Sequence, residues 1–222
     1  MKLKALVFDA YGTLFDVHSV IALGERLWPG KGAALSQAWR TKQLEYTWQR
    51  SLMRRYADFG RVTEAGLRYA CAALKLELGD AQVAQLMQQY LRLSLYPEAR
   101  EALDALRGRK LKLAILSNGS PAMLAPLVTN SGLDVVLDAV LSVDELKIYK
   151  PDPAVYQLAV DRLVIAKEAI GFVSSNCWDA CGAKSFGFHT CWINRAGAPL
   201  DALDATPDHT IARLTDLAAL ID

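Results

Sequence analysis

The chain has 222 residues, of which 52% are hydrophobic and 22% are charged, a composition that excludes a disordered protein and indicates a well-buried globular one. Its 25 basic and 24 acidic residues leave a formal net charge of +1, so bulk charge attracts neither nucleic acid nor an anionic membrane. The first apolar run ends at Asp9, too early for a signal peptide, and no stretch approaches the roughly 20 apolar residues of a membrane helix. We therefore expect a cytoplasmic protein without nucleic-acid or membrane partners.

The first predicted element is residues 4–9, a short apolar run that precedes a glycine-containing turn and predicts a buried strand. About eighty residues without a convincing strand follow. They predict four helices, at residues 17–29, 33–55, 63–78 and 80–95. The segment 96–98 contains Pro97, which resists continuing the preceding helix and marks the return to the core. We therefore expect a helical cap domain at 16–96, inserted into a core formed by 1–15 and 97–222.

The rest of the chain alternates between strand and helix patterns. The predicted strands are residues 111–117, 135–142, 169–175 and 188–193. The predicted helices are residues 98–108, 121–131, 152–163 and 179–186. This alternation predicts an α/β fold with a doubly wound parallel sheet, in which ligands bind outside the carboxyl ends of the strands.

The four cysteines do not form a recognisable metal-binding pattern. Cys177 and Cys181 are four residues apart, but a zinc site needs a second pair of ligands that the neighbouring sequence does not supply. Cys71 and Cys191 are isolated. We expect four free, buried thiols and no metal site.

Polar residues follow the predicted strands at the edge where ligands are expected. They are Asp9 after the first strand, Ser117 and Asn118 after the second, Lys150 in the loop after the third, and the segment 174–179 after the fourth. Each has an ordinary interpretation as a turn cap, a tight turn, a solvated lysine or an acid at a helix N-terminus. Their convergence on one edge favours a functional site.

These residues resemble the motifs of the haloacid dehalogenase (HAD) superfamily, in order and spacing, across the whole chain. The segment 9–14 (Asp-Ala-Tyr-Gly-Thr-Leu) is similar to the first motif, Ser117 to the second, Lys150 to the third, and 174–179 to the fourth. The resemblance implies a Rossmann-like HAD core, a nucleophilic Asp9 and a covalent aspartyl ester intermediate.

Two positions distinguish this chain from the phosphatases of that superfamily. Phosphatases place a second aspartate two residues after the nucleophile, where it protonates the leaving alkoxide; here the residue is Tyr11, whose pKa near 10 does not suit that task. A halide leaves as a stable anion and needs no proton. The acid that helps to hold Mg²⁺ is replaced by Ser175, so we expect no cofactor and no metal.

The helix predicted at 33–55 carries Arg40, Leu44 and Trp48 on one stripe. An arginine in an apolar stripe either reaches out to solvent or meets an anion. This segment, together with the Ser-Asn-Cys-Trp-Asp sequence at 175–179, resembles the L-2-haloacid dehalogenases, also called (S)-2-haloacid dehalogenases. In that group the arginine faces the active site, which implies that Arg40 binds the anion here.

The resemblance assigns a role to each predicted site residue. The expected catalytic residues are Asp9, Thr13, Arg40, Ser117, Lys150, Tyr156, Ser174, Asn176 and Asp179. Thr13 is expected to steady Asp9; Lys150, Ser174 and Asn176 to position Asp179 as the general base; and Tyr156 to orient the lysine or the substrate. The expected substrate-binding residues are Ala10, Tyr11, Arg40, Leu44, Phe59, Ser117, Asn118 and Trp178.

The expected reaction is hydrolytic dehalogenation of small (S)-2-haloacids to (R)-2-hydroxyacids, by attack of Asp9 on C2 and hydrolysis of the ester. Two alternatives are a Mg²⁺-dependent phosphatase or phosphonate hydrolase of the same superfamily, and a non-catalytic binding module. Family resemblance also implies a homodimer.

Overall fold

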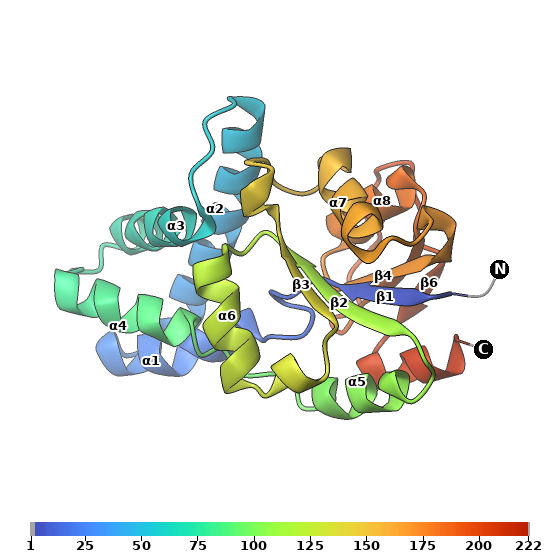
Figure 1. Ribbon diagram of the computed structural model, residues 1–222. Coiled ribbons are helices and arrows are strands. Elements are labelled where there is room, and N and C mark those ends of the chain that lie inside the picture. The colour runs from blue at the N-terminus through green and yellow to red at the C-terminus, as the bar shows by residue number, and fades with distance from the viewer. Residues whose placement is uncertain (1–2, 222) are drawn as a thin grey trace.

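The computed structural model describes residues 3–221 and has a six-stranded, wholly parallel sheet at its centre (Figure 1). Its strands are β1 (Ala5–Phe8), β2 (Lys112–Ser117), β3 (Ala139–Ser142), β4 (Ile170–Ser174), β5 (His189–Ile193) and β6 (His209–Ile211). They lie in the order β3-β2-β1-β4-β5-β6. The strand order reverses beside β1, so the carboxyl end of β1 lies where ligands of doubly wound sheets bind. The predicted fold class is confirmed.

The helices follow the predicted alternation. They are α1 (Ile21–Leu27), α2 (Gly32–Leu52), α3 (Phe59–Ala73), α4 (Asp80–Tyr90), α5 (Ala99–Arg107), α6 (Pro121–Asn130), α7 (Pro153–Leu163) and α8 (Cys177–Phe186). Short 3-10 helices are η1 (Val17–Val20), η2 (Leu133–Val135), η3 (Val143–Glu145), η4 (Lys167–Ala169) and η5 (Leu214–Ala219). In Figure 1, α7 and α8 cover one face of the sheet while α5 lies on the other. All four residues of β1 are buried, as expected of a strand covered on both faces.

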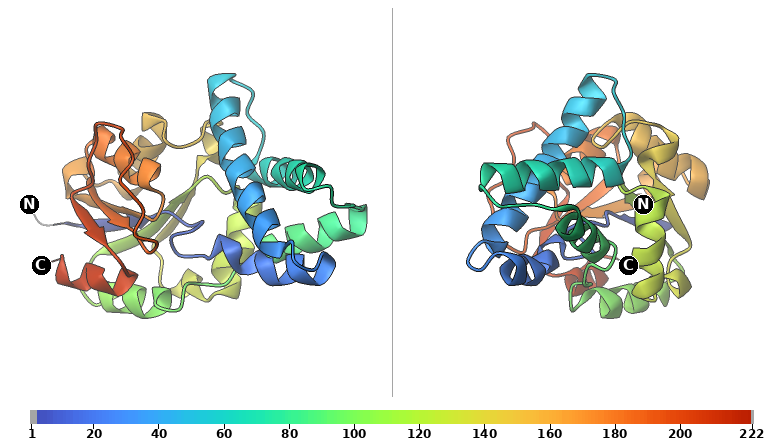
Figure 2. Two further views of the ribbon diagram at one scale, coloured as in Figure 1. Left: turned by 180° about the vertical axis from the view of Figure 1, so that it is seen from behind. Right: turned by 90° about the vertical axis from the view of Figure 1, so that its left-hand side faces the viewer.

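The helices α1 to α4 form a separate layer beyond the carboxyl ends of the strands (Figure 2). The long helix α2 packs closely on α3, because Gly66 has no side chain to keep them apart: a Cβ there would lie 3.3 Å from the carbonyl oxygen of Trp39. The indole N–H of Trp39 donates across the same interface to the carbonyl of Thr63 at 2.7 Å. This layer places the middle of α2 above the end of β1.

The structure corrects several predicted boundaries. The strand predicted at 135–142 is only Ala139–Ser142, because Gly132 adopts a left-handed conformation (φ +67°) and the chain turns through η2 first. The helix predicted at 63–78 is α3, which Asp58 caps at its start and which ends before Lys75 at φ +56°. The elements β6 and η5, near the end of the chain, were not predicted.

Two further observations concern membrane-spanning helices and the cysteines. Within residues 3–221, no helix is long and apolar enough to cross a membrane. The four cysteines are free and buried, as predicted. Cys177 and Cys181 lie with their sulfur atoms 3.9 Å apart on α8.

Candidate active site

The carboxylate of Asp9 lies at the end of β1 and is 5% exposed. Its backbone N–H continues the sheet by donating to the carbonyl of Val173 at 2.9 Å. The chain then turns sharply through Gly12, whose φ of +93° favours glycine. This turn brings Thr13 back toward the carboxylate, so that its hydroxyl donates to Asp9 Oδ2 at 3.1 Å.

Two further side chains bind the Asp9 carboxylate. Lys150 Nζ donates to Oδ1 at 3.1 Å, and the side-chain amide of Asn176 donates to Oδ2 at 3.0 Å. Together with the Thr13 hydroxyl, these groups engage both carboxylate oxygens. Charge-assisted hydrogen bonds of this kind fix the orientation of a carboxylate.

Lys150 links Asp9 to a second buried acid, Asp179. Its Nζ lies 3.0 Å from Asp179 Oδ2, and both side chains are at most 1% exposed. Burial disfavours the charge on Lys150, but the carboxylates of Asp179 and Asp9 outweigh it and hold its pKa above the ordinary value. Burial, aided by the charge of Asp9 and opposed by Lys150, raises the pKa of Asp179 to about 6. Asp179 is therefore an acid whose protonation changes near neutral pH.

Tyr156 is the other partner of Asp179. Its hydroxyl donates to Asp179 Oδ1 at 2.9 Å, and burial raises the pKa of Tyr156 well above its ordinary value, so it stays a donor. This differs from the prediction, which placed Ser174 and Asn176 beside Asp179. Among residues 3–221, only Lys150 and Tyr156 side chains hydrogen-bond that carboxylate; Asn176 turns to Asp9 instead.

Arg40 projects from α2 to the loop after β1. Its Nη2 donates to the carbonyl of Tyr11 at 3.1 Å and to Asn176 Oδ1 at 3.2 Å. Its Nη1 donates to Gln43 Oε1 at 2.8 Å. The guanidinium therefore faces the site rather than bulk solvent, as predicted. Sequence reasoning missed Gln43; the structure buries it fully one turn after Arg40, and a buried glutamine needs hydrogen-bond partners. Its only sequence signal is a polar side chain three residues after Arg40 on the same helix.

The remaining predicted polar residues support the loops. The Ser117 hydroxyl accepts from the N–H of Gly119 at 3.0 Å, and Asn118 Oδ1 accepts from the N–H of Lys150 at 3.0 Å. The Ser174 hydroxyl accepts from the N–H of Asn176 at 3.1 Å. All three side chains are buried. Ser117 holds its own turn, Asn118 holds the backbone of Lys150, and Ser174 holds the backbone of Asn176.

Aromatic side chains also lie on the elements that carry the polar residues of the site. The ring of Tyr11 lies 5.1 Å from that of Phe59, and Trp178 lies 5.3 Å from Trp48 in an edge-to-face arrangement. Leu44 and Arg40 line a cavity of about 360 Å³ beside the loop at 175–177. Ala10, which follows Asp9 in the turn after β1, is fully buried. The Tyr11 hydroxyl and the Trp48 indole N–H are buried without a partner among residues 3–221.

Ser175 and Arg195 make further contacts with the turn after β1, which sequence reasoning did not predict. The backbone N–H of Ser175 donates to the Thr13 hydroxyl at 2.9 Å, which orients the threonine toward Asp9. Arg195 donates to the carbonyls of Gly12 and Thr13 from the segment after β5. No local motif indicates either contact, since both depend on segments more than 160 residues apart in the chain.

The donor set does not fit a divalent cation. Mg²⁺ requires several oxygen ligands, yet Lys150 and Asn176 take up the Asp9 carboxylate and a serine occupies position 175. Among the residues that the structure describes, no group of three His, Cys, Asp or Glu side chains could hold a metal ion.

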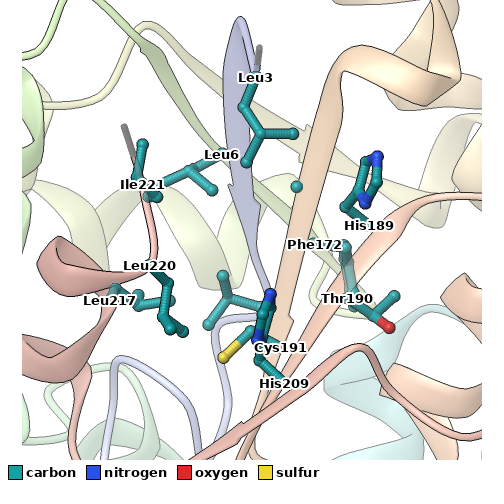
Figure 3. Close-up of a pocket in the computed structure, with 12 residues that line it drawn as sticks. Leu3, Leu6, Phe172, His189, Thr190, Cys191, His209, Leu217, Leu220 and Ile221 are labelled. Carbon is teal, nitrogen blue, oxygen red and sulfur yellow. The ribbon is translucent and has the colours of Figure 1, made fainter. Parts of the chain in front are cut away.

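A second cavity, of about 200 Å³, lies at the opposite ends of the strands (Figure 3). It is lined mainly by apolar side chains such as Leu3, Leu6 and Leu217, with His189 and His209 among the others. Its described lining holds no carboxylate, lysine or arginine, so it offers none of the chemistry of the Asp9 site.

A buried aspartate held by a lysine at the carboxyl end of a central parallel strand suits the class of hydrolases that use an aspartate as nucleophile. A family model described as "haloacid dehalogenase-like hydrolase" matches residues 3–187. The chain belongs to this family.

Individual relatives match almost the whole chain. The (S)-2-haloacid dehalogenase of Pseudomonas sp. (strain YL) is 48% identical over 220 residues, covering 99% of this chain and 95% of the relative. Haloacetate dehalogenase H-2 of Moraxella sp. (strain B) is 46% identical, covering 99% and 98%. The structure of L-2-haloacid dehalogenase from Xanthobacter autotrophicus with chloropropionic acid covalently bound has a TM-score of 0.92 at 42% identity and covers 98% of each chain.

Proposed function

We propose that the protein is an (S)-2-haloacid dehalogenase, which hydrolyses small (S)-2-haloacids to (R)-2-hydroxyacids and halide. The observation that carries this proposal is that a side-chain cation, Lys150, bonds both Asp9 at 3.1 Å and Asp179 at 3.0 Å. The names of the relatives and the covalently bound chloropropionic acid in one of them support the same reaction.

Residue 11 explains why the leaving group is a halide. A phosphate ester needs a proton on its leaving alkoxide, but burial raises the pKa of Tyr11 well above its ordinary value, opposed by Arg40 and aided by Asp9. Tyr11 therefore does not cycle between acid and base at neutral pH. A halide leaves without a proton, so the tyrosine is no obstacle to dehalogenation.

The substrate carboxylate must approach a negatively charged Asp9. Two unit charges about 4 Å apart repel by about 4 kcal/mol at an effective dielectric constant of about 20. Lys150 and Arg40 offset this repulsion, since the two cations balance the charges of Asp9 and Asp179. We infer that Ser117 and the backbone amides of Ala10 and Tyr11 anchor the carboxylate.

In the first step, an Asp9 oxygen attacks C2 of the haloacid from the side opposite the halogen. The C–halogen bond breaks as the C–O bond forms, so C2 is inverted and the halide departs with the bonding electrons. We infer that Arg40 and Asn118 receive the halide. Tyr11, Leu44, Phe59 and Trp178 form the apolar wall that accommodates the halogen and excludes water.

In the second step, water attacks the carbonyl carbon of the Asp9 ester. Asp179 accepts a proton from this water and returns it to the departing alkoxide oxygen as the ester C–O bond breaks, which restores the Asp9 carboxylate and releases the 2-hydroxyacid with an oxygen that came from Asp9. The hydrogen bonds from Lys150 and Tyr156 hold the Asp179 carboxylate in place for this task. Ser174 contributes by holding Asn176, and Thr13 by holding Asp9.

We also propose that residues 16–96 act as a cap over the core and that the protein is a cytoplasmic homodimer. The exposed apolar side chains of Leu52 (85%) and Met53 (62%) at the end of α2, with Tyr69 (45%) on α3, offer a surface for this contact. Light scattering should give twice the chain mass of 24.4 kDa. A single chain mass at micromolar concentration would contradict the homodimer.

The proposed function is tested by halide release from both enantiomers of 2-chloropropionate, in buffer containing EDTA. Chloride release from the S enantiomer is expected to survive EDTA and to be abolished by Asp9→Asn. Asp161→Asn is the matched control, since this exposed aspartate on α7 bonds only Gln157 among the described residues. Release that requires Mg²⁺, or phosphate release from phosphate esters instead, would contradict the proposal.

A further inference from the structure

Arg195 follows β5 and reaches the turn after Asp9. Its Nη1 donates to the carbonyl of Gly12 at 3.1 Å and its Nη2 to the carbonyl of Thr13 at 3.0 Å. Backbone carbonyls in a tight turn lack strand partners and need donors from elsewhere. Arg195 therefore satisfies two consecutive carbonyls of the turn that orients the nucleophile.

Glu98 and Tyr96 fix the guanidinium in this position. Glu98, only 8% exposed, accepts from Arg195 Nε at 3.2 Å and from Nη2 at 3.1 Å. The ring of Tyr96 lies 3.7 Å from the Arg195 guanidinium carbon, a close cation–π contact. The guanidinium makes these four hydrogen bonds from three nitrogens in one plane, a geometry that a lysine ammonium, with three donors on a single nitrogen, does not match.

The same residues lie where the chain passes between the sheet and the helices α1 to α4. The two connecting segments run side by side: Phe15 bridges Leu95, and the N–H of Tyr96 donates to the carbonyl of Leu14 at 2.9 Å. Arg195 thus contacts the outgoing segment through Thr13 and the returning segment through Tyr96 and Glu98.

We propose that Arg195, held by Glu98, is a positioning residue that keeps the Asp9 carboxylate in line for attack on C2. It acts through the turn at Gly12 and Thr13 and does not touch the reacting atoms. The inference rests on the proposed function, because it concerns the ester-forming step. A misplacement of about 1 Å costs on the order of 100-fold in rate, so loss of two carbonyl anchors acts mainly on this step.

The test compares Arg195→Lys with wild type in single-turnover reactions with (S)-2-chloropropionate, measuring ester formation and substrate dissociation constant separately. Ester formation is expected to slow by about 10- to 100-fold, while the dissociation constant changes less than about 3-fold because Arg40 and Ser117 are untouched. Arg162→Lys is the matched control: Arg162 pairs with the exposed Glu145 and should leave both quantities unchanged.

A second arm separates positioning from folding. Arg195 lines the open cavity beside Arg40, so methylguanidinium can reach the space vacated in Arg195→Ala and should restore ester formation, whereas methylammonium should not. If the Arg195 variants do not fold, the same measurements are made on Glu98→Gln. Ester formation in this variant is expected to slow by at least about 5-fold, with the substrate dissociation constant unchanged.

Unchanged ester formation in folded Arg195→Lys, a loss confined to substrate affinity, or absence of rescue would each overturn the inference. A wild-type protein that releases no halide from any 2-haloacid would instead overturn the proposed function.

Discussion

Replacing Lys150 by methionine tests the charge balance of the site most sharply. The lysine is 1% exposed, and its Nζ lies within 3.1 Å of two buried carboxylates. Each contact is worth about 5 kcal/mol of attraction at an effective dielectric constant of about 20, before the cost of burial is subtracted. Removing one member of a buried ion pair costs about 3–5 kcal/mol of stability, and we expect a loss of that size near pH 8.

The pH dependence of this loss identifies its cause. In the wild type, the pKa of Asp179 is raised from 3.8 to about 6, so the folded protein binds this proton more tightly than the unfolded chain. The contribution to stability therefore falls as pH rises through that window and is constant above it. Without Lys150, the two carboxylates should retain one proton through the neutral range. Stability should then keep falling above pH 6, by about 1.4 kcal/mol per pH unit.

Urea denaturation between about pH 5.5 and 8.5 measures both effects. Lys147→Met is the control, because Lys147 lies in the same loop but is 59% exposed in its pair with Asp144, and an exposed pair contributes at most about 1 kcal/mol. A Lys150→Met variant as stable as wild type, or one whose loss does not grow with pH, would refute the reasoning.

Three further changes have distinct expected outcomes. The rate of ester hydrolysis should fall as pH decreases through about 6, because Asp179 must be deprotonated to accept a proton; a pH-independent rate between 5 and 8 would contradict this role. Gln43→Met removes an acceptor 2.8 Å from Arg40, so KM for (S)-2-chloropropionate should rise about 10-fold or more in steady-state assays. Gly119→Ala places a Cβ 2.8 Å from the Tyr11 ring and should cost about 1–3 kcal/mol in urea denaturation; an unchanged midpoint would count against the close packing.

The sequence predicts the central fold well because each core strand is a short apolar run between turn residues. The run at residues 5–8 and that at 170–174 are buried throughout, which is why hydrophobicity alone finds them. The strand β6 has three residues, two of them exposed polar ones, so it carries no comparable signal. The prediction was wrong for the first half of the strand at 135–142, because the apolar residues after Gly132 form a turn instead.

The residues of the site also differ in how well the sequence predicts them. Residues at strand ends, such as Asp9 and Ser117, follow from the rule that ligands bind at the carboxyl ends of parallel strands. The partners of Asp179 do not, because the choice between Asn176 and Tyr156 depends on the direction in which each side chain leaves α8 or α7. Arg195 could not be predicted for a related reason: its contacts with the first turn depend on the sheet order, in which only β4 separates β5 from β1.

The most direct test of the account is the path of the water oxygen. With enzyme in excess over (S)-2-chloropropionate in ¹⁸O-water, mass spectrometry of the peptide containing Asp9 should find the label in the Asp9 carboxylate, and the first 2-hydroxyacid released should be unlabelled. Label in the product of this first turnover, with an unlabelled Asp9, would mean that water attacks C2 directly and would contradict the covalent role of the aspartate.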